Sequence, residues 1–215
     1  MSKGGVLPCS RNTSSKVRVK SAQHHCTSLR AEIAALVDRI DLRSLNGFAR
    51  TLREAGTRRG AIYLLGNGAS ASLALHLAAD LIQISKRAPR KFFPRIAPLC
   101  ADVSTLTAIS NDYGYREVFL VQLIGPLVQN DVVIGISASG RSPNVLKGLT
   151  LARKRRAVAL GLTSTTGERM ARLCDICFMV DSRNKFTVEA VHVAFTQILI
   201  ASMSDSLGVR WSVLG

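Results

Sequence analysis

The stretch YLLGNGASASLALHLAADL, residues 63–81, contains the local pattern from which the fold of this chain is predicted. An apolar run ends at Gly66, and apolar residues at helical spacing begin a few positions later. The glycines of the loop, Gly66 and Gly68, let the backbone approach a ligand closely, and the following helix offers free N–H groups to an anion. The stretch therefore predicts a buried strand, an anion-binding loop and a helix.

The alternation of strand and helix continues along the chain. Short apolar runs span residues 61–65, 96–100, 131–137, 157–163 and 176–180, and segments with helical spacing separate them. Fully apolar strands between helices are typical of a parallel sheet that is buried on both faces. We therefore predict an α/β fold with a doubly wound, five-stranded parallel sheet, in which ligands bind beyond the carboxyl ends of the strands.

The segment before the first strand predicts two helices and a tail. Helical spacing covers residues 28–40, with Ser28 as the N-cap, and residues 44–56, with Gly56 as the stop. Residues 1–30 contain six Lys or Arg and no Asp or Glu. We expect a flexible basic tail over residues 1–27 and a single domain over residues 28–215.

Composition narrows the class of protein. The formal net charge of +15 attracts phosphate in any form, including nucleic acid and small phosphorylated substrates. No uninterrupted apolar run reaches the roughly 20 residues that a membrane span needs, and no secretory signal is evident. Five cysteines, an odd number, favour a reducing cytoplasm. Cys174 and Cys177 are expected in one strand, on opposite faces, rather than in a metal site.

A second loop, SASGRSPNVLKG at residues 137–148, follows the third predicted strand. Ser137, Ser139 and Ser142 surround a glycine, and Pro143 suits the first position of the next helix. Three hydroxyls beside the free backbone N–H groups form a compact site for one phosphate group. The alternative is that serine here is only a helix cap, for which one residue would suffice.

The first loop alone also fits the dinucleotide fingerprint G-x-G-x-x-A. That fold places an acidic residue about 20 positions further on to bind the ribose, whereas this chain has the basic stretch SKRAPRKFF at residues 85–93. A basic stretch can accept a 2′-phosphate, so NADP stays open. A dinucleotide leaves the second phosphate loop unexplained, however, and a sugar monophosphate accounts for it.

The stretches LLGNGASASLALHLAADL, LTAISNDYGY, NDVVIGISASGRSPNVLKG and AVALGLTSTTGERMARLCDICFMV closely resemble the sugar isomerase (SIS) domain, and within it the phosphoheptose isomerase branch. The resemblance covers about residues 28–205. It implies a flavodoxin-like sheet, a homotetramer with active sites between subunits, zinc in many members, and isomerisation of sedoheptulose 7-phosphate or a related sugar phosphate. The residues that it assigns to substrate binding are Ser70, Ser137, Ser139 and Ser142 for the phosphate, and Asn67 and Asp112 for the sugar.

The positions that the resemblance assigns to catalysis depart from the family pattern. Isomerisation through an enediol needs a base at carbon and an acid at oxygen. The family's histidine and the glutamate four residues later fall on His76 and Asp80, which share one helical face. Its glutamine and histidine, eight residues apart on the last helix, fall on Glu189 and Gln197. Gln197 cannot donate and recover a proton at neutral pH.

Two hypotheses follow from this rewritten site. In the first, the chain is a divergent isomerase with Asp80 or Glu189 as base and His192, one turn from Glu189, as acid. His76, Asp80, Glu189 and Gln197 would then be the zinc ligands, unless His76 is only a packed histidine. In the second, the chain is a non-catalytic SIS binding protein of the type that associates with a replication initiator. A DNA-binding SIS regulator is less favoured, because residues 1–27 are too short for a separate helix-turn-helix domain.

Overall fold

The structure is a computed structural model that describes residues 21–88 and 92–209. Most of the predicted basic tail, part of the basic stretch at residues 85–93, and Trp211 lie outside the described residues. The five predicted strands are all present, as β1 (Ala61–Gly66), β2 (Arg95–Pro98), β3 (Val132–Ile136), β4 (Val158–Ser164) and β5 (Ile176–Val180). They form one parallel sheet in the order β2-β1-β3-β4-β5, which confirms the doubly wound, flavodoxin-like prediction.

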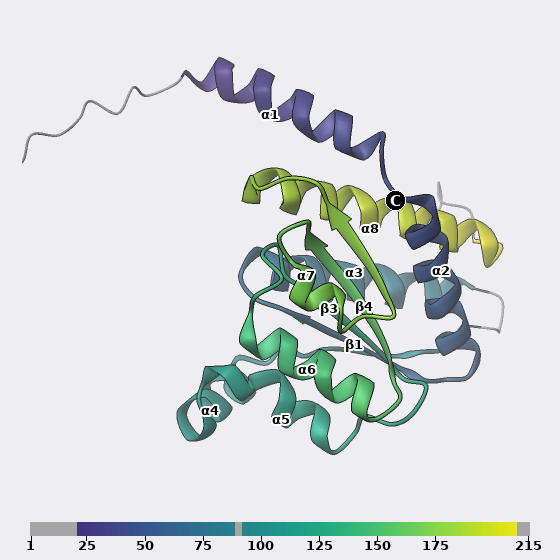
Figure 1. The fold of residues 1–215 in the computed structure, drawn as a ribbon. Helices are drawn as coiled ribbons and strands as arrows, with labels where there is room; N and C mark the ends of the chain where they lie inside the picture. The colour runs from purple at the N-terminus through teal and green to yellow at the C-terminus, as the bar shows by residue number, and fades with distance from the viewer. Residues whose placement is uncertain (1–20, 89–91, 210–215) are drawn as a thin grey trace, which may run out of the picture.

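Helices cover both faces of the sheet (Figure 1). One face carries α2 (Leu42–Thr57), α3 (Ala69–Arg87) and α8 (Lys185–Ser206). The other face carries α5 (Val118–Ile124) and α6 (Pro143–Lys154), with α4 (Val103–Tyr113) and the short 3-10 helix η1 (Tyr115–Glu117) beside them. The short helix α7 (Glu168–Ala171) connects β4 to β5. The apolar side chains therefore divide into two core clusters, one on each side of the sheet.

Aromatic stacking joins the last helix to the sheet. Phe195 of α8 is fully buried, and its ring stacks on Phe178 of β5 with 4.2 Å between the ring centroids. The ring of Phe48 of α2 packs edge-on against the ring of Phe195, with 5.3 Å between the ring centroids. Offset-stacked and edge-to-face pairs are the arrangements that aromatic rings prefer, so this trio holds α2, α8 and β5 together.

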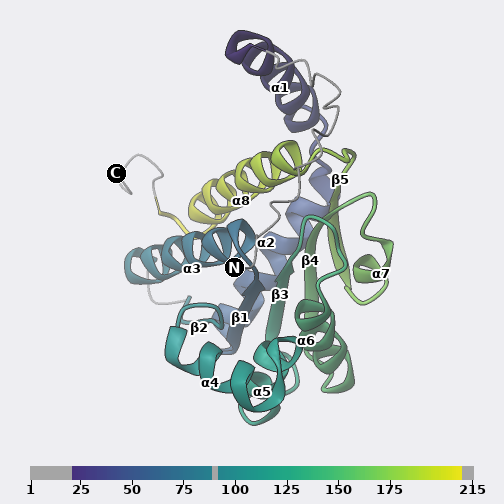
Figure 2. The same cartoon turned by 90° about the vertical axis from the view of Figure 1, so that its left-hand side faces the viewer.

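The helix at the N-terminus begins earlier than the sequence pattern predicts. Helix α1 spans Ala22–Val37 and is capped by Ser21, whose side chain accepts a hydrogen bond from the His24 N–H. Ser28, the predicted cap, lies inside the helix, where its hydroxyl donates to the His24 carbonyl at 2.8 Å. Residues 22–27, which the sequence pattern assigns to the tail, are therefore helical. Helix α1 stands away from the body and none of its residues is fully buried (Figure 2).

The second helix also differs from its predicted bounds. Helix α2 begins at Leu42, because the Asp41 carboxylate caps it by accepting hydrogen bonds from the N–H groups of Arg43 and Ser44. Gly56 does not stop the helix but lies within its last turn. A Cβ at Gly56 would stand 2.2 Å from the ring of Phe92, so this glycine makes room for an aromatic side chain.

Helix α8 spans 22 residues and is rich in apolar side chains. By length and composition alone it could cross a membrane, although half of its most apolar window is buried inside the molecule. The core helix of a globular protein meets the same criteria. Its burial against α1, α2 and α3 accounts for its apolar composition without a membrane.

The two cysteines of the C-x-x-C motif lie together, contrary to the prediction that they point to opposite faces. Strand β5 begins only at Ile176, so Cys174 belongs to the preceding turn rather than to the strand. A Cβ on Gly161 of β4 would meet the Cys174 sulfur at 2.6 Å and the Cys177 sulfur at 2.9 Å. The hydrogen bond between the thiols raises the pKa of Cys174 and lowers the pKa of Cys177.

Candidate active site

A cavity of about 390 Å³ opens at the carboxyl edge of the sheet, where the sequence places the ligand. This volume lies within the range of small-molecule sites. The lining comes from the loops after β1, β3, β4 and β5 and from the first turns of α3 and α8. The predicted residues that line the cavity are Asn67, Ser70, Ser137, Ser139, Ser142 and Glu189. Polar side chains that the sequence reasoning missed are Ser164, Thr166, Ser182, Arg183 and Lys185.

The serine loop after β3 is arranged to present hydroxyls to the cavity. Ser142 is the N-cap residue of α6, yet its side chain makes no capping hydrogen bond within the described structure. Its Oγ instead lies 3.0 Å from the Oγ of Ser137, which is almost fully buried. The Oγ of Ser139 accepts a weak hydrogen bond from the Arg141 N–H at 3.3 Å. Capping therefore does not explain the serines, and their hydroxyls stay directed to the cavity beside the helix N-terminus.

The loop after β1 is fixed by glycine geometry and by an amide clamp. A Cβ at Gly66 would lie 2.4 Å from the Ser70 carbonyl oxygen, so no side chain fits there. The amides of Asn67 and Asn144 exchange two hydrogen bonds, at 2.9 and 3.0 Å, and the Tyr115 hydroxyl donates to Asn67 at 2.8 Å. Because Asn144 lies in the first turn of α6, these hydrogen bonds fix the loop after β1 relative to the loop after β3, the two loops predicted to bind phosphate.

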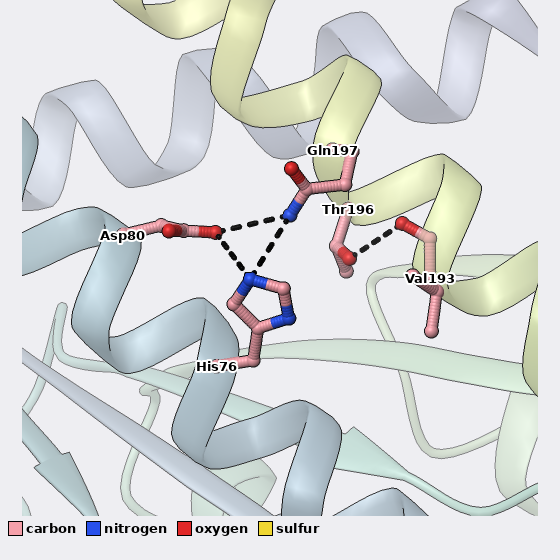
Figure 3. Close-up of polar contacts among 5 residues, drawn as sticks. All are labelled: His76, Asp80, Val193, Thr196 and Gln197. Atoms are coloured by element: carbon pink, nitrogen blue, oxygen red, sulfur yellow. Dashed lines mark hydrogen bonds and ion pairs between the residues drawn. The ribbon is translucent and has the colours of Figure 1, made fainter. Parts of the chain in front are cut away.

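His76, Asp80 and Gln197 meet between α3 and α8 (Figure 3). The Nε2 atom of His76 lies 3.5 Å from Oδ2 of Asp80, and the Gln197 amide nitrogen donates to the same carboxylate oxygen at 3.1 Å. Gln197 also approaches the His76 Nε2 at 3.5 Å. The side chain of His76 is half exposed, so it is not a packed core histidine.

Glu189 lies apart from this cluster, so the predicted zinc set does not assemble within one chain. Its carboxylate lines the cavity and pairs with Lys185 at 3.6 Å. Over residues 21–88 and 92–209, no group of three or more His, Cys, Asp or Glu side chains is arranged to hold a metal ion. Gln197 presents its amide nitrogen, which is a donor and not a metal ligand, to His76 and Asp80. These residues do not fit zinc as they stand.

His192 is a core residue, and the predicted role as catalytic acid is wrong. Its side chain is almost fully buried, packs near the ring of Phe178, and does not line the cavity. The Nε2 atom lies 3.0 Å from the Thr163 carbonyl oxygen, which only accepts hydrogen bonds, so Nε2 carries the proton of the neutral ring. Burial lowers the pKa of His192 from 6.5 to about 4.

This buried histidine predicts a loss of stability in mild acid. The unfolded chain takes up the proton near the ordinary pKa of 6.5, whereas the folded chain resists protonation until about 4. Stability is therefore fully present above the unfolded pKa and declines as the pH falls from there toward the folded pKa. The free energy of unfolding should drop by about 2 kcal/mol between about pH 7 and about pH 5.

Urea denaturation at the two pH values measures this drop. His192→Gln keeps a side-chain N–H for the Thr163 carbonyl but does not titrate, so the variant should lose most of the pH dependence. An equal drop in both proteins would assign the effect to other groups.

Asp112 also falls outside the cavity of its own chain. It lies exposed on α4, and its carboxylate accepts a hydrogen bond from the Asn111 amide at 3.0 Å. The prediction that Asp112 faces the sugar is therefore not met within a single chain.

A residue that the sequence reasoning did not select, Glu32, reaches the cavity wall from α1. Ser182 lines the cavity, and its hydroxyl donates to the Glu32 carboxylate at 2.6 Å. Asn184, the N-cap of α8, donates to the other carboxylate oxygen at 3.5 Å. The hydrogen bond from Ser182 is the main reason that the pKa of Glu32 is lowered. Helix α1 thus positions the loop between β5 and α8, although Glu32 and Ser182 are far apart in the sequence.

The sequence of this chain is similar to a known domain family and to proteins named phosphoheptose isomerase. The SIS domain family model matches residues 28–164. The chain is 36% identical over 184 residues to the phosphoheptose isomerase of Aneurinibacillus thermoaerophilus, covering 86% of this chain and 92% of the relative. It is 41% identical over 151 residues to the phosphoheptose isomerase of Solidesulfovibrio magneticus, covering 70% of this chain and 72% of the relative.

Two solved structures share the fold over most of this chain. The phosphoheptose isomerase of Neisseria gonorrhoeae superimposes with a TM-score of 0.78 at 26% identity, covering 86% of this chain and all of that one. The phosphoheptose isomerase of Francisella tularensis gives a TM-score of 0.77 at 21% identity over 87% of this chain, which supports the fold alone.

Proposed function

Because this chain belongs to the SIS domain family, we propose that it is a sugar phosphate isomerase of the phosphoheptose isomerase type. The observation that carries the proposal is one cavity that holds both the serine loop and the carboxylate of Glu189. The substrate class follows from the relatives, whose names specify a phosphoheptose. We therefore take sedoheptulose 7-phosphate as the first substrate to test.

The serine loop supplies the phosphate site in this proposal. Hydroxyls of Ser137, Ser139 and Ser142 and the free N–H groups of α6 bind the phosphate oxygens. Ser70 and the N-terminus of α3 approach from the other loop. Anchoring the phosphate at this end orients the sugar chain along the cavity, so that its carbonyl end reaches the side formed by α8.

Glu189 is the base that the geometry favours over Asp80. An aldose–ketose isomerisation moves a proton between adjacent carbons through an enediol, and one carboxylate can remove and return it. Glu189 lines the cavity, whereas Asp80 lies in the cluster with His76 and Gln197. Lys185, 3.6 Å from Glu189, would place a cation where negative charge develops on the substrate oxygen.

Incubation with sedoheptulose 7-phosphate, followed by NMR, tests the proposed reaction. We expect conversion to a heptose 7-phosphate, measured with and without added zinc because zinc binding stays a prediction. Glu189→Gln should abolish turnover while retaining substrate affinity, since the amide keeps the shape but cannot take a proton. Substrate that binds yet is never converted, with or without zinc, would contradict the isomerase proposal.

The cluster around Gln197 yields a gain-of-function prediction. The resemblance assigns the acid to the position of Gln197, which does not line the cavity of its own chain, so Gln197→His tests whether this position reaches the substrate in the assembled protein. If it does, turnover of sedoheptulose 7-phosphate should rise by about tenfold. Asp80→Glu, which extends the carboxylate by one methylene, should add to the gain. The rate constants of the two single variants and the double variant measure it. If both changes lower turnover, the cluster is adapted to another substrate.

We also propose a homotetramer, as the resemblance implies. Apolar side chains remain exposed on α3 and α8, namely Leu75, Ile82, Val193 and Ile198. Helix α1 has no fully buried residue and projects from the body (Figure 1). Subunit contacts at these helices would bury both features.

Light scattering at micromolar concentration checks the oligomeric state. We expect four chain masses, and Val193→Glu combined with Ile198→Glu should lower the measured mass, because charges in an apolar interface remain unpaired. A single chain mass for the unmodified protein would contradict the tetramer.

The non-catalytic alternative is not favoured, since the relatives are isomerases by name. We also propose a cytoplasmic location, which the free thiols of the four described cysteines support.

A further inference from the structure

A second, wider hollow adjoins the cavity. It has a volume of about 830 Å³ and shares Thr166 and Arg183 with the cavity. Four arginines line it: Arg141, Arg169, Arg172 and Arg183. We call this site the arginine hollow. Neither the family resemblance nor the proposed reaction assigns it a role.

The fold builds the cavity and the arginine hollow from the same three loops. Each loop, after β3, β4 or β5, places a hydroxyl in the cavity and an arginine in the hollow one to three residues later. The pairs are Ser139 with Arg141, Thr166 with Arg169, and Ser182 with Arg183. Because all three strands are parallel, their loops meet at one edge of the sheet and the arginines converge there.

Two glycines bring the loops into contact. A Cβ on Gly140, whose φ is +61°, would lie 2.4 Å from the Cα of Gly167. A Cβ on Gly167 would lie 2.1 Å from the Thr163 hydroxyl oxygen. The loops after β3 and β4 can therefore touch only while Gly140 lacks a side chain, whereas the missing Cβ of Gly167 lets its own loop fold back onto Thr163 near the end of β4. The contact between the two loops holds Arg141 beside the segment that carries Arg169.

Carboxylates of the described residues balance the charges of the arginine hollow only in part, and Asp181 accepts a hydrogen bond from the lining Thr165 at 3.4 Å. Glu168 is the only carboxylate among the lining residues, and it pairs with Arg172 at 3.1 Å. Both side chains of this pair are largely exposed, so the pair neutralises little of the local field. No carboxylate contact is described for Arg141, Arg169 or Arg183 across residues 21–88 and 92–209. Guanidinium groups gathered around a concave site suit phosphate, which they bind with paired hydrogen bonds.

We propose that the arginine hollow binds a second phosphate group while the serine loop holds the first. This inference rests on the proposed function for the placement of the first phosphate. The ligand class is a sugar bisphosphate with a phosphate at each end. A phosphate ester at C1 blocks the carbon that isomerisation must convert to an aldehyde, so such a ligand binds without turnover and inhibits. The second source of the same chemistry is a separate phosphate compound bound beside the substrate.

Calorimetry with matched ligands distinguishes these sources. Sedoheptulose 1,7-bisphosphate should bind at least about tenfold tighter than sedoheptulose 7-phosphate, because the guanidinium groups of the hollow add charge-assisted hydrogen bonds to the second phosphate. Arg141→Gln combined with Arg169→Gln should remove that preference and leave the affinity for the monophosphate within about twofold. Inorganic phosphate, titrated into protein saturated with sedoheptulose 7-phosphate, tests for a separate ligand. If inorganic phosphate binds to this saturated protein and does not bind to the double variant, the arginine hollow is a phosphate site and its ligand is a separate phosphate compound.

The control is Arg50→Gln combined with Arg53→Gln on α2, which removes equal charge far from both sites. This control should leave both affinities and their ratio unchanged at about 0.15 M salt. Two results would overturn the proposal. In the first, the bisphosphate binds no tighter than the monophosphate and inorganic phosphate does not bind. In the second, both double variants lower the affinity for all ligands by the same factor. Turnover is measured separately: binding without conversion of the monophosphate refutes the isomerase, while the ratio of the two affinities still tests the arginine hollow.

Discussion

Replacing both Ser137 and Ser139 by alanine should weaken the binding of sedoheptulose 7-phosphate by about 2–4 kcal/mol, or about 30- to 900-fold. Ser137 is almost fully buried, and the partner described for its hydroxyl is another cavity hydroxyl, that of Ser142. Ser139 receives only a weak contact from the adjacent backbone. Neither hydroxyl is needed to hold the fold, so both are free to donate to phosphate oxygens. Their loss should therefore be felt in binding rather than in stability.

Calorimetry on the double variant measures this loss, with the free energy of unfolding as a second measurement. Ser85→Ala combined with Ser206→Ala is the matched control, since those hydroxyls donate to carbonyls of their own helices. The control should bind as the parent does. An unchanged affinity in the Ser137 and Ser139 variant would place the phosphate elsewhere.

Phe195→Ala should lower the free energy of unfolding by about 3–5 kcal/mol. The ring is fully buried between Phe178 and Phe48, so its removal leaves a cavity that three separate elements line. These elements come from distant parts of the chain, and the surrounding backbone has little freedom to collapse. The cost should therefore lie in the upper part of the range for aromatic truncations.

Phe186→Ala provides a matched truncation on the same helix. Phe186 is 73% exposed in the first turn of α8, and its loss should change stability by less than about 0.5 kcal/mol. Urea denaturation at one fixed protein concentration measures both variants, because subunit association would shift the midpoint with concentration. Equal effects at Phe186 and Phe195 would show that the aromatic trio does not stabilise the core.

The sheet could be predicted because most of its strands are apolar runs that lie between helical segments. The glycines at Gly66 and Gly68 marked the first loop, and the serines around Gly140 marked the second. These signals are local, so the sequence alone located the cavity edge and most of its hydroxyls. Gly66 meets a physical requirement, since a Cβ there would collide with the backbone at Ser70.

The errors arose where a residue's neighbours come from elsewhere in the chain. Helix α8 is apolar nearly all round, so spacing could not reveal that His192 faces the core while Glu189 faces the cavity. Ser28 resembles a cap, but the helix continues past it to Ser21. Cys174 and Cys177 met because the strand begins two residues after Cys174. The arginine hollow could not be seen at all, since Arg141, Arg169 and Arg183 converge only after three strands are paired.

Helix α1 sets how far the chain can be shortened without altering the site. Every residue of the cavity lies after Ile62, and the sheet needs nothing from α1 to pair its strands. Yet Glu32 supports Ser182 and the start of α8 through two hydrogen bonds. A truncation just before α2 would keep all five strands but would remove Glu32. The loop between β5 and α8 would then lose the two hydrogen bonds that Glu32 accepts. We therefore expect that a chain designed to keep the site intact must begin before Glu32, although the strands of the sheet begin only at Ala61.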